Sequence, residues 1–240
     1  GIRHILEVYH RPLLACTVKN IKACKQALLG GIDIVFCPDT PGIVEQAVIT
    51  TPITGKHTLI LPDITNSSGA MLERAQTLSR KGAIGFSTSI AGGLDGIISL
   101  RTYRHSVLSA HNTLPNMSTQ VSIMLSALAG ADIVNATQKN DLKPVAEILP
   151  PQKMPFVRVN VKCTKNIPEL ITKWGNNIIL ELTNLEHPEV SQQRLESHSA
   201  KHFGGIINEV RAARQAIEAT MHRIPLKEYA QAHEELMQAL

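Results

Sequence analysis

Short apolar segments alternate along this chain with longer segments in which apolar residues recur every three or four positions. Continuous apolar runs such as 12–18 and 32–36 are typical of parallel strands that are buried on both faces. The spacing of Ile21, Cys24, Ala27 and Leu28 within 20–29 is typical of an amphipathic helix. The strand-then-helix unit occurs eight times between Pro12 and Phe203.

The pattern predicts the bounds of each strand and each helix. The predicted strands are 12–18, 32–36, 58–61, 83–86, 106–110, 132–135, 156–161 and 178–182. The predicted helices are 20–29, 43–48, 68–80, 94–103, 118–129, 142–148, 167–174 and 205–221. A further amphipathic helix is predicted over 224–240, packed outside the other elements.

Eight such units predict an α/β fold, a (β/α)8 TIM barrel with an extra C-terminal helix. The 240 residues fit one barrel domain, 1–240. An open doubly wound sheet is the alternative. It commonly has a glycine-rich phosphate turn after its first strand, whereas the turn here is Lys19-Asn20-Ile21.

Composition narrows the class of protein. The net charge of +4 is spread along the chain, which does not favour nucleic-acid binding and equally suits an acidic or phosphorylated small molecule or a plain solvated surface. No apolar run is long enough for a membrane span. The four cysteines form no CxxC motif, and Cys16 and Cys24 are predicted to be buried thiols. We therefore expect a cytoplasmic protein that binds neither nucleic acid nor membrane.

In barrels of this kind the chemistry lies at the carboxyl ends of the strands. Lys19, after the first strand, is a candidate to bind phosphate or to transfer protons, or it is a lysine extending along the rim. His111, after the fifth, is the best candidate for a general acid or base, or it is a structural histidine. The other polar or reactive residues at strand ends are Cys37, Asp39, Asp63, Thr65, Asn66, Ser87, Thr88, Asn112, Asn135, Thr137, Lys162, Thr183, Asn184 and His187.

Acidic residues are too scattered to predict a metal site. Mg²⁺ is normally held by clustered carboxylates, but Asp39, Asp63 and Glu181 come from three separate strands. Cys37 has no neighbouring base in the sequence and is interpreted as an inert thiol. From these residues no cofactor and no metal ligand is predicted.

Three segments resemble the large-subunit family of RuBisCO and RuBisCO-like proteins. The first is GIRHILEVYHRPLLACTVK, which leads into the first strand. The second, ALLGGIDIVF, is similar to the family's A-L-G-G-x-D-x-x-K pattern. The third is the closing segment from His202, with its IPLKEYAQAHEELMQAL ending. The resemblance covers nearly the whole chain and is weakest between the sixth and eighth strands.

The resemblance implies roles for two residues and the loss of a metal site. Lys19 matches the family lysine that contacts substrate and transfers protons, and His111 matches the strand-five histidine. The family holds Mg²⁺ with a K-D-D-E run whose lysine is carbamylated, and here that run is Phe36-Cys37-Pro38-Asp39. Of these four residues only Asp39 is acidic, so the resemblance implies that this chain lacks most of the ligands with which the family binds Mg²⁺.

Other family positions are also changed. Asn112 stands for an arginine and Asn135 for a histidine, while Lys162 ends the segment that replaces a Ser-Gly-Gly phosphate turn. Thr183 and Asn184 replace a glycine pair whose backbone N–H groups approach phosphate closely. By resemblance these five residues are candidates for substrate binding.

The resemblance also implies a homodimer built through this barrel, and an N-terminal α+β domain that this chain lacks. Two functions follow as hypotheses. One is a degenerate RuBisCO-like barrel that performs no CO₂ fixation and binds a phosphorylated, sugar-like ligand. The other is an active enolase or isomerase of the methionine-salvage type, in which Lys19 is the acid or base and His111 assists. Loss of the metal weighs against carboxylase chemistry, because a metal contributes several kcal/mol of charge stabilisation in such reactions.

Overall fold

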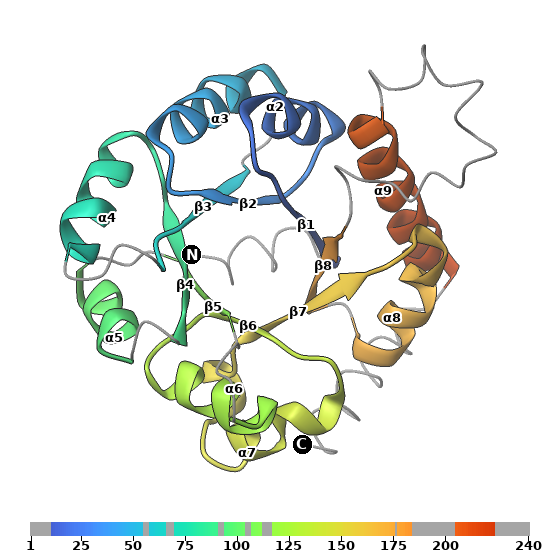
Figure 1. The fold of residues 1–240 in the computed structure, drawn as a ribbon. Coiled ribbons are helices and arrows are strands. Elements are labelled where there is room, and N and C mark those ends of the chain that lie inside the picture. Colours follow the sequence, from blue (N-terminus) through green and yellow to red (C-terminus); the bar gives the residue numbers. More distant parts are fainter. Residues whose placement is uncertain are drawn as a thin grey trace.

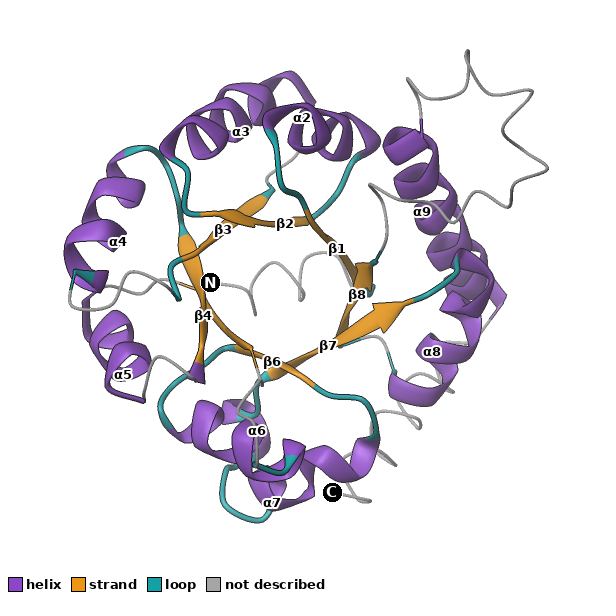
Figure 2. Ribbon diagram, viewed as in Figure 1, coloured by secondary structure: helices purple, strands orange, loops and turns teal. Residues whose placement is uncertain are grey.

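The computed structural model describes residues 11–54, 58–65, 70–90, 94–103, 107–111, 117–175, 177–183 and 205–223, and it confirms the predicted barrel. Eight parallel strands close into one sheet in chain order, with β1 beside β8, and the helices surround it (Figures 1 and 2). The predicted helix 224–240 lies outside the described residues.

The strands run over β1 (Leu13–Thr17), β2 (Ile34–Pro38), β3 (Leu59–Asp63), β4 (Gly85–Ser89), β5 (Val107–His111), β6 (Ile133–Asn135), β7 (Phe156–Val161) and β8 (Ile178–Leu182). The α-helices are α2 (Ile21–Gly30), α3 (Pro41–Thr54), α4 (Met71–Arg80), α5 (Leu94–Tyr103), α6 (Thr119–Leu128), α7 (Lys143–Ala146), α8 (Ile167–Trp174) and α9 (Gly205–Arg223). Three 3₁₀ turns are η2 (Lys139–Leu142), η3 (Pro151–Lys153) and η4 (Thr164–Asn166).

Most predicted bounds agree with the structure within two or three residues, and α5, β7, α8 and β8 agree at both ends. The predicted helix 142–148 is wrong in extent. The chain there forms the 3₁₀ turn η2 and then the single turn α7, because Asp141 accepts hydrogen bonds from the backbone N–H groups of Thr137 and Gln138 and so holds the loop. Helix α3 is longer than predicted, beginning at Pro41, where proline suits the first turn.

Alternate residues of each strand face two different cores. Leu14, Cys16 and Val35 pack with helical residues such as Cys24 in the layer between sheet and helices. Leu13, Ala15, Ile34, Phe36, Leu59, Leu61, Ile133 and Ile179 form a second cluster, which fills the inside of the barrel. The core is therefore mainly aliphatic on both sides of the sheet, with Phe36 inside the barrel and Phe86 and Trp174 in the outer layer.

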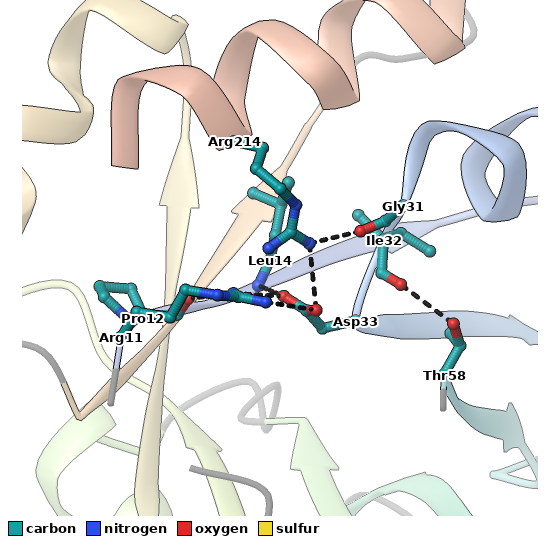
Figure 3. Close-up of polar contacts among 8 residues, drawn as sticks. All are labelled: Arg11, Pro12, Leu14, Gly31, Ile32, Asp33, Thr58 and Arg214. Atoms are coloured by element: carbon teal, nitrogen blue, oxygen red, sulfur yellow. Dashed lines mark hydrogen bonds and ion pairs between the residues drawn. The ribbon is translucent and has the colours of Figure 1, made fainter. Parts of the chain in front are cut away.

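An ionic cluster joins the two ends of the barrel sequence at the amino-terminal edge of the strands (Figure 3). Asp33, which is 4% exposed, accepts hydrogen bonds from Arg11 at 2.9 and 3.0 Å, from Arg214 of α9 at 3.0 Å and from the backbone N–H of Leu14 at 2.9 Å. Burial raises the pKa of Asp33, but the hydrogen bond from Arg11 and the charges of Arg214 and Arg11 outweigh it, so the pKa is lowered. The cluster ties β1 and β2 to α9.

Candidate functional site

The inside of the barrel becomes polar toward the carboxyl ends of the strands. Above the apolar cluster, the residues at inward-facing strand positions include Thr17, Asp63, Ser87, Ser109, Asn135, Arg158 and Glu181. This end of a (β/α)8 barrel is where catalytic and binding sites form. The structure thus places the polar residues on the face where the sequence predicted chemistry.

A cavity of about 320 Å³ opens over the ends of the first three strands. Its lining residues are Thr17, Val18, Lys19, Phe36, Cys37, Pro38, Asp39 and Asp63. We call it the mouth pocket. Lys19 lies two residues after the end of β1 and is exposed, which gives the pocket a cation that a ligand can reach.

The two carboxylates that line the mouth pocket are held by neighbouring groups. Asp39 pairs with Nε of Arg74 from α4 at 2.9 Å, and Arg74 also donates to the Asp39 carbonyl. Asp63 accepts a hydrogen bond from the backbone N–H of Thr65 at 2.9 Å and another from the Thr65 hydroxyl. Asp39 therefore links the end of β2 to α4, whereas Asp63 stabilises the turn at the end of its own strand.

Cys37 is the fourth ionisable group of the lining, after Lys19, Asp39 and Asp63, and it is protonated at neutral pH. Burial, and after it the nearby Cys24, Asp63 and Asp39, raise the pKa of the Cys37 thiol to about 12. Since the thiolate is the reactive species, Cys37 is not suited to act as a nucleophile. This agrees with its interpretation from sequence as an inert thiol.

Beneath the floor of the mouth pocket lies a buried ion pair that the sequence reasoning missed. Arg158 of β7 is 5% exposed and pairs with Glu181 of β8, also 5% exposed. Nε of Arg158 donates to Oε2 at 2.6 Å, Nη2 donates to Oε1, and Thr17 donates to Oε1 at 2.7 Å. One feature of the sequence could have indicated this ion pair: Arg158 is a charged residue at an inward-facing position of the otherwise mostly apolar strand FVRVNV.

Phe36 covers this ion pair. The guanidinium carbon of Arg158 lies 3.8 Å from the centroid of the Phe36 ring, a cation–π contact. Such contacts contribute up to about 2 kcal/mol when they are desolvated. Phe36 and Thr17, which both line the mouth pocket, thus separate it from the charged pair below.

These residues do not fit a Mg²⁺ centre. Phe36 has no nitrogen to carbamylate, Pro38 offers no side-chain oxygen, and the Asp39 carboxylate is paired with Arg74. Within the described part of the chain, no three His, Cys, Asp or Glu side chains are grouped closely enough to hold a metal ion. The adjacent guanidinium of Arg158 would in addition repel a divalent cation.

The remaining predicted site residues are placed as follows. His111 is the last residue of β5 and lies opposite Ser89 of β4 in the strand register, but its side chain is not described. Asn135 ends β6 beside Arg158 and is half-buried, while Lys162 follows β7 and is exposed. Thr183 follows β8, and its hydroxyl donates to the Val161 carbonyl at 3.1 Å. Asn112 and Asn184 lie outside the described residues, as do Asn66 and His187.

Strands β2, β3, β4 and β5 end later in the chain than predicted, which changes the position of five candidates. Asp63 is the last residue of β3, and His111 is the last residue of β5. Cys37 lies within β2, and Ser87 and Thr88 lie within β4, all nearly fully buried. The prediction that they follow their strands is wrong, because the upper barrel accepts polar side chains inside the sheet. Ser87 keeps its inward position beside Asp63 in the register.

A second cavity, of about 380 Å³, lies among α6, η3 and the amino-terminal ends of β6 and β7. Its lining includes the Arg101–Asp132 ion pair, with N···O 2.9 Å, and the apolar side chains of Leu149 and Phe156. Asp132 also accepts a hydrogen bond from the backbone of Leu108. Since this end of a barrel serves stability, we place the functional site at the mouth pocket.

No protein-family model matches this sequence. No curated protein sequence matches it either. Solved structures share its fold. A dimeric archaeal Rubisco from Hyperthermus butylicus aligns with 100% of this chain and 67% of its own, at 21% identity and a TM-score of 0.72. A Rubisco-like protein from Alicyclobacillus acidocaldarius aligns with 99% of this chain and 69% of its own, at 21% identity and a TM-score of 0.73. KGPDC from Streptococcus mutans is more distant, at 12% identity and a TM-score of 0.61.

These likenesses confirm, for the fold, the resemblance to RuBisCO and RuBisCO-like proteins that the sequence indicated. Both true Rubisco and Rubisco-like proteins are among the similar structures, so the fold is compatible with either kind of activity. None of the helices in the described part of the chain combines the length and hydropathy that a membrane span requires.

Proposed function

We propose that this chain is a RuBisCO-like barrel that has lost the Mg²⁺-carbamate chemistry and binds a phosphorylated, sugar-like small molecule at the mouth pocket. The observation that supports this most directly is Phe36, which stands at the carbamate position and packs on the guanidinium of Arg158. A carboxylase that depends on a metal-bound enediolate is incompatible with that arrangement.

Binding of an anionic ligand is supported by the charges at the pocket. Lys19 is exposed at its edge, while Asp39 is paired with Arg74 and Asp63 is hydrogen-bonded within its own turn. A lysine at a pocket rim attracts phosphate as a point charge and needs no metal to do so. The mildly basic chain, with a net charge of +4, is consistent with an acidic ligand.

The alternative is an active, metal-free enolase or isomerase on a phosphosugar-type substrate. It is favoured by the position of Lys19, which lines the same pocket that a substrate would enter. In this reaction Lys19 would take a proton from the carbon beside a carbonyl and return one to a neighbouring atom. His111, at the end of β5, would assist.

A titration with ribulose 1,5-bisphosphate tests the proposal, with and without Mg²⁺ and bicarbonate, followed by calorimetry. We expect binding that is independent of Mg²⁺, weakened about tenfold or more in Lys19→Ala, since hydrogen bonds to charged groups contribute roughly 1.5–3 kcal/mol. Lys25→Ala is the charge-matched control, because Lys25 is exposed on α2 away from the pocket lining. A strict requirement for Mg²⁺, or no binding at all, would overturn the proposal.

Turnover separates the two functions. If the alternative is right, the protein incubated in D₂O with the same sugar phosphate exchanges the hydrogen beside the carbonyl, as seen by NMR. Lys19→Ala abolishes that exchange. Binding without hydrogen exchange supports the proposed function, in which the protein binds the sugar phosphate and does not convert it.

We further propose that the chain assembles as a homodimer. One protein of similar fold is described as a dimeric Rubisco, and the family resemblance implies dimerisation through the barrel. Sedimentation velocity is expected to give about twice the 26.2 kDa chain mass at micromolar concentration. A monomer at all concentrations would contradict this.

A further inference from the structure

The guanidinium of Arg158 has one nitrogen that the described structure leaves without a partner. Nε and Nη2 both point to Glu181. Nη1 is fully buried and has no hydrogen-bond partner among the residues that the structure describes. A buried donor without an acceptor costs about 1–3 kcal/mol, so its presence in a packed barrel calls for an explanation.

We propose that Nη1 of Arg158 is a phosphate-binding donor at the floor of the mouth pocket, the internal cation that takes the role of a metal in anchoring an anionic ligand. The inference rests on the proposed function and adds to it the residue that recognises the ligand's phosphate group. Lys19 at the rim and Arg158 at the floor would then hold the same ligand from two sides.

The chemistry of the ion pair leaves Arg158 able to do this. A carboxylate bound side-on by Nε and Nη2 occupies one edge of the guanidinium and leaves Nη1 on the opposite edge. Glu181 is satisfied on its own side by Arg158 and by the Thr17 hydroxyl at 2.7 Å. The pair therefore fixes the guanidinium rigidly while its second edge stays available.

Two residues of the pocket lining contact the guanidinium that carries Nη1. Thr17 and Phe36 line the mouth pocket, and each also contacts Arg158: Nη2 lies 3.4 Å from the Thr17 hydroxyl, and the Phe36 ring covers the guanidinium. Rotation of the Phe36 ring away from Arg158 would bring the floor donor into the pocket. The contact that is lost would be replaced by a charge-assisted hydrogen bond to phosphate.

The test is a titration with inorganic phosphate, which carries the recognised group alone, followed by ³¹P NMR. Arg158→Met by itself would leave Glu181 as an uncompensated buried charge, and such changes cost about 3–5 kcal/mol of stability. The informative variant is therefore Arg158→Met/Glu181→Met, which removes the pair together and is expected to stay folded. Urea unfolding of each variant verifies that it does.

Two variants are expected to move affinity in opposite directions. Arg158→Met/Glu181→Met weakens phosphate binding about tenfold, by loss of a charged hydrogen bond. Glu181→Gln keeps a hydrogen-bond acceptor for Arg158 but removes the competing negative charge, so phosphate binds at least about threefold more tightly. The first change is the discriminating one, because the double variant removes one positive and one negative charge and so leaves the net charge beneath the pocket unchanged.

The other outcomes are also decisive. If phosphate binding is lost in Lys19→Ala but unchanged in both Arg158-pair variants, the floor donor is refuted while the proposed function stands. If the wild-type protein does not bind inorganic phosphate, the floor donor is refuted as well. The ribulose 1,5-bisphosphate titration then decides the proposed function by itself.

Discussion

Phe36 and Arg158 are the two residues that most change the expected chemistry of this barrel. Sequence reasoning identified Phe36 as a residue that cannot be carbamylated, but it had no means of seeing that the ring packs on a guanidinium from β7, more than 120 residues away in the chain. Such a contact depends on closure of the sheet. The sequence shows that a phenylalanine stands at position 36, but it does not show that Arg158 is the residue it contacts.

Cysteine reactivity is a residue-scale prediction. Burial raises the pKa of Cys24 to about 11 and of Cys37 to about 12, burial also raises the pKa of Cys16, and Cys163 is exposed. At pH 8 the folded protein is expected to react with Ellman's reagent at about one thiol per chain, since only an accessible thiolate attacks.

The Cys163→Ser variant should abolish that rapid reaction, and urea should expose the three remaining thiols. Labelling of Cys37 in the native protein, detected by peptide mass spectrometry, would contradict the buried position of this thiol.

At the scale of the elements, helix packing around the sheet relies on close approach. A Cβ added to Gly30, the last residue of α2, would lie 2.8 Å from Cβ of Val210 in α9, closer than real Cβ contacts occur. Gly31 follows with φ of 90°, a conformation that glycine adopts without strain, and ends the helix. The Gly-Gly pair therefore both ends α2 and lets α9 pack closely against it.

Gly30→Ala is expected to lower the free energy of unfolding by about 1–3 kcal/mol, the usual cost of overpacking a filled site. The additional change Val210→Ala should recover part of that loss by making room. Gly42→Ala in α3 is the control, because a Cβ there meets nothing within 4 Å. Urea unfolding measures all three, and a Gly30→Ala variant as stable as wild type would show that α2 and α9 can separate without cost.

At the scale of the whole molecule, the two ends of the barrel have different tasks. The amino-terminal edge carries the Arg11–Asp33–Arg214 cluster, which joins the start of the barrel to its last described helix. The carboxyl-terminal end carries the mouth pocket and the Arg158–Glu181 pair. This division matches the general separation of stability and function in (β/α)8 barrels.

Low pH should weaken the Arg11–Asp33–Arg214 cluster and so lower the stability of the protein. Because the pKa of Asp33 is lower in the folded protein than in the unfolded chain, its ionised form contributes stability above about pH 4, and that stability is lost as pH falls through the folded pKa. Unfolding followed from pH 7 to pH 2 should show a declining free energy below about pH 4. Asp33→Asn should lower stability by about 3–5 kcal/mol at pH 7 and flatten the decline.

If Asp33→Asn kept the full acid-dependent loss, other carboxylates would have to account for it. Asp141 is the first to examine, because burial raises its pKa while hydrogen bonds from Gln138 and Thr137 outweigh that effect and lower it.

The order of the elements, the closed parallel barrel and the location of Lys19 at its mouth follow from the sequence by itself. Apolar periodicity is local, and eight repeated strand–helix units leave few ways to bury both faces of the strands. That Phe36, Cys37 and Pro38 offer no hard oxygen ligand in their side chains is likewise evident from the sequence.

Only the tertiary structure decided which charges meet. Closure of the sheet pairs β8 with β1 and so brings Arg158 and Glu181 into contact with Thr17 and Phe36, which line the mouth pocket. It also shows Asp39 and Asp63 satisfied by their own neighbours. Pairing between distant strands sets these contacts, because the Coulomb energy and desolvation of a charge depend on its surroundings in space and not on its place in the chain.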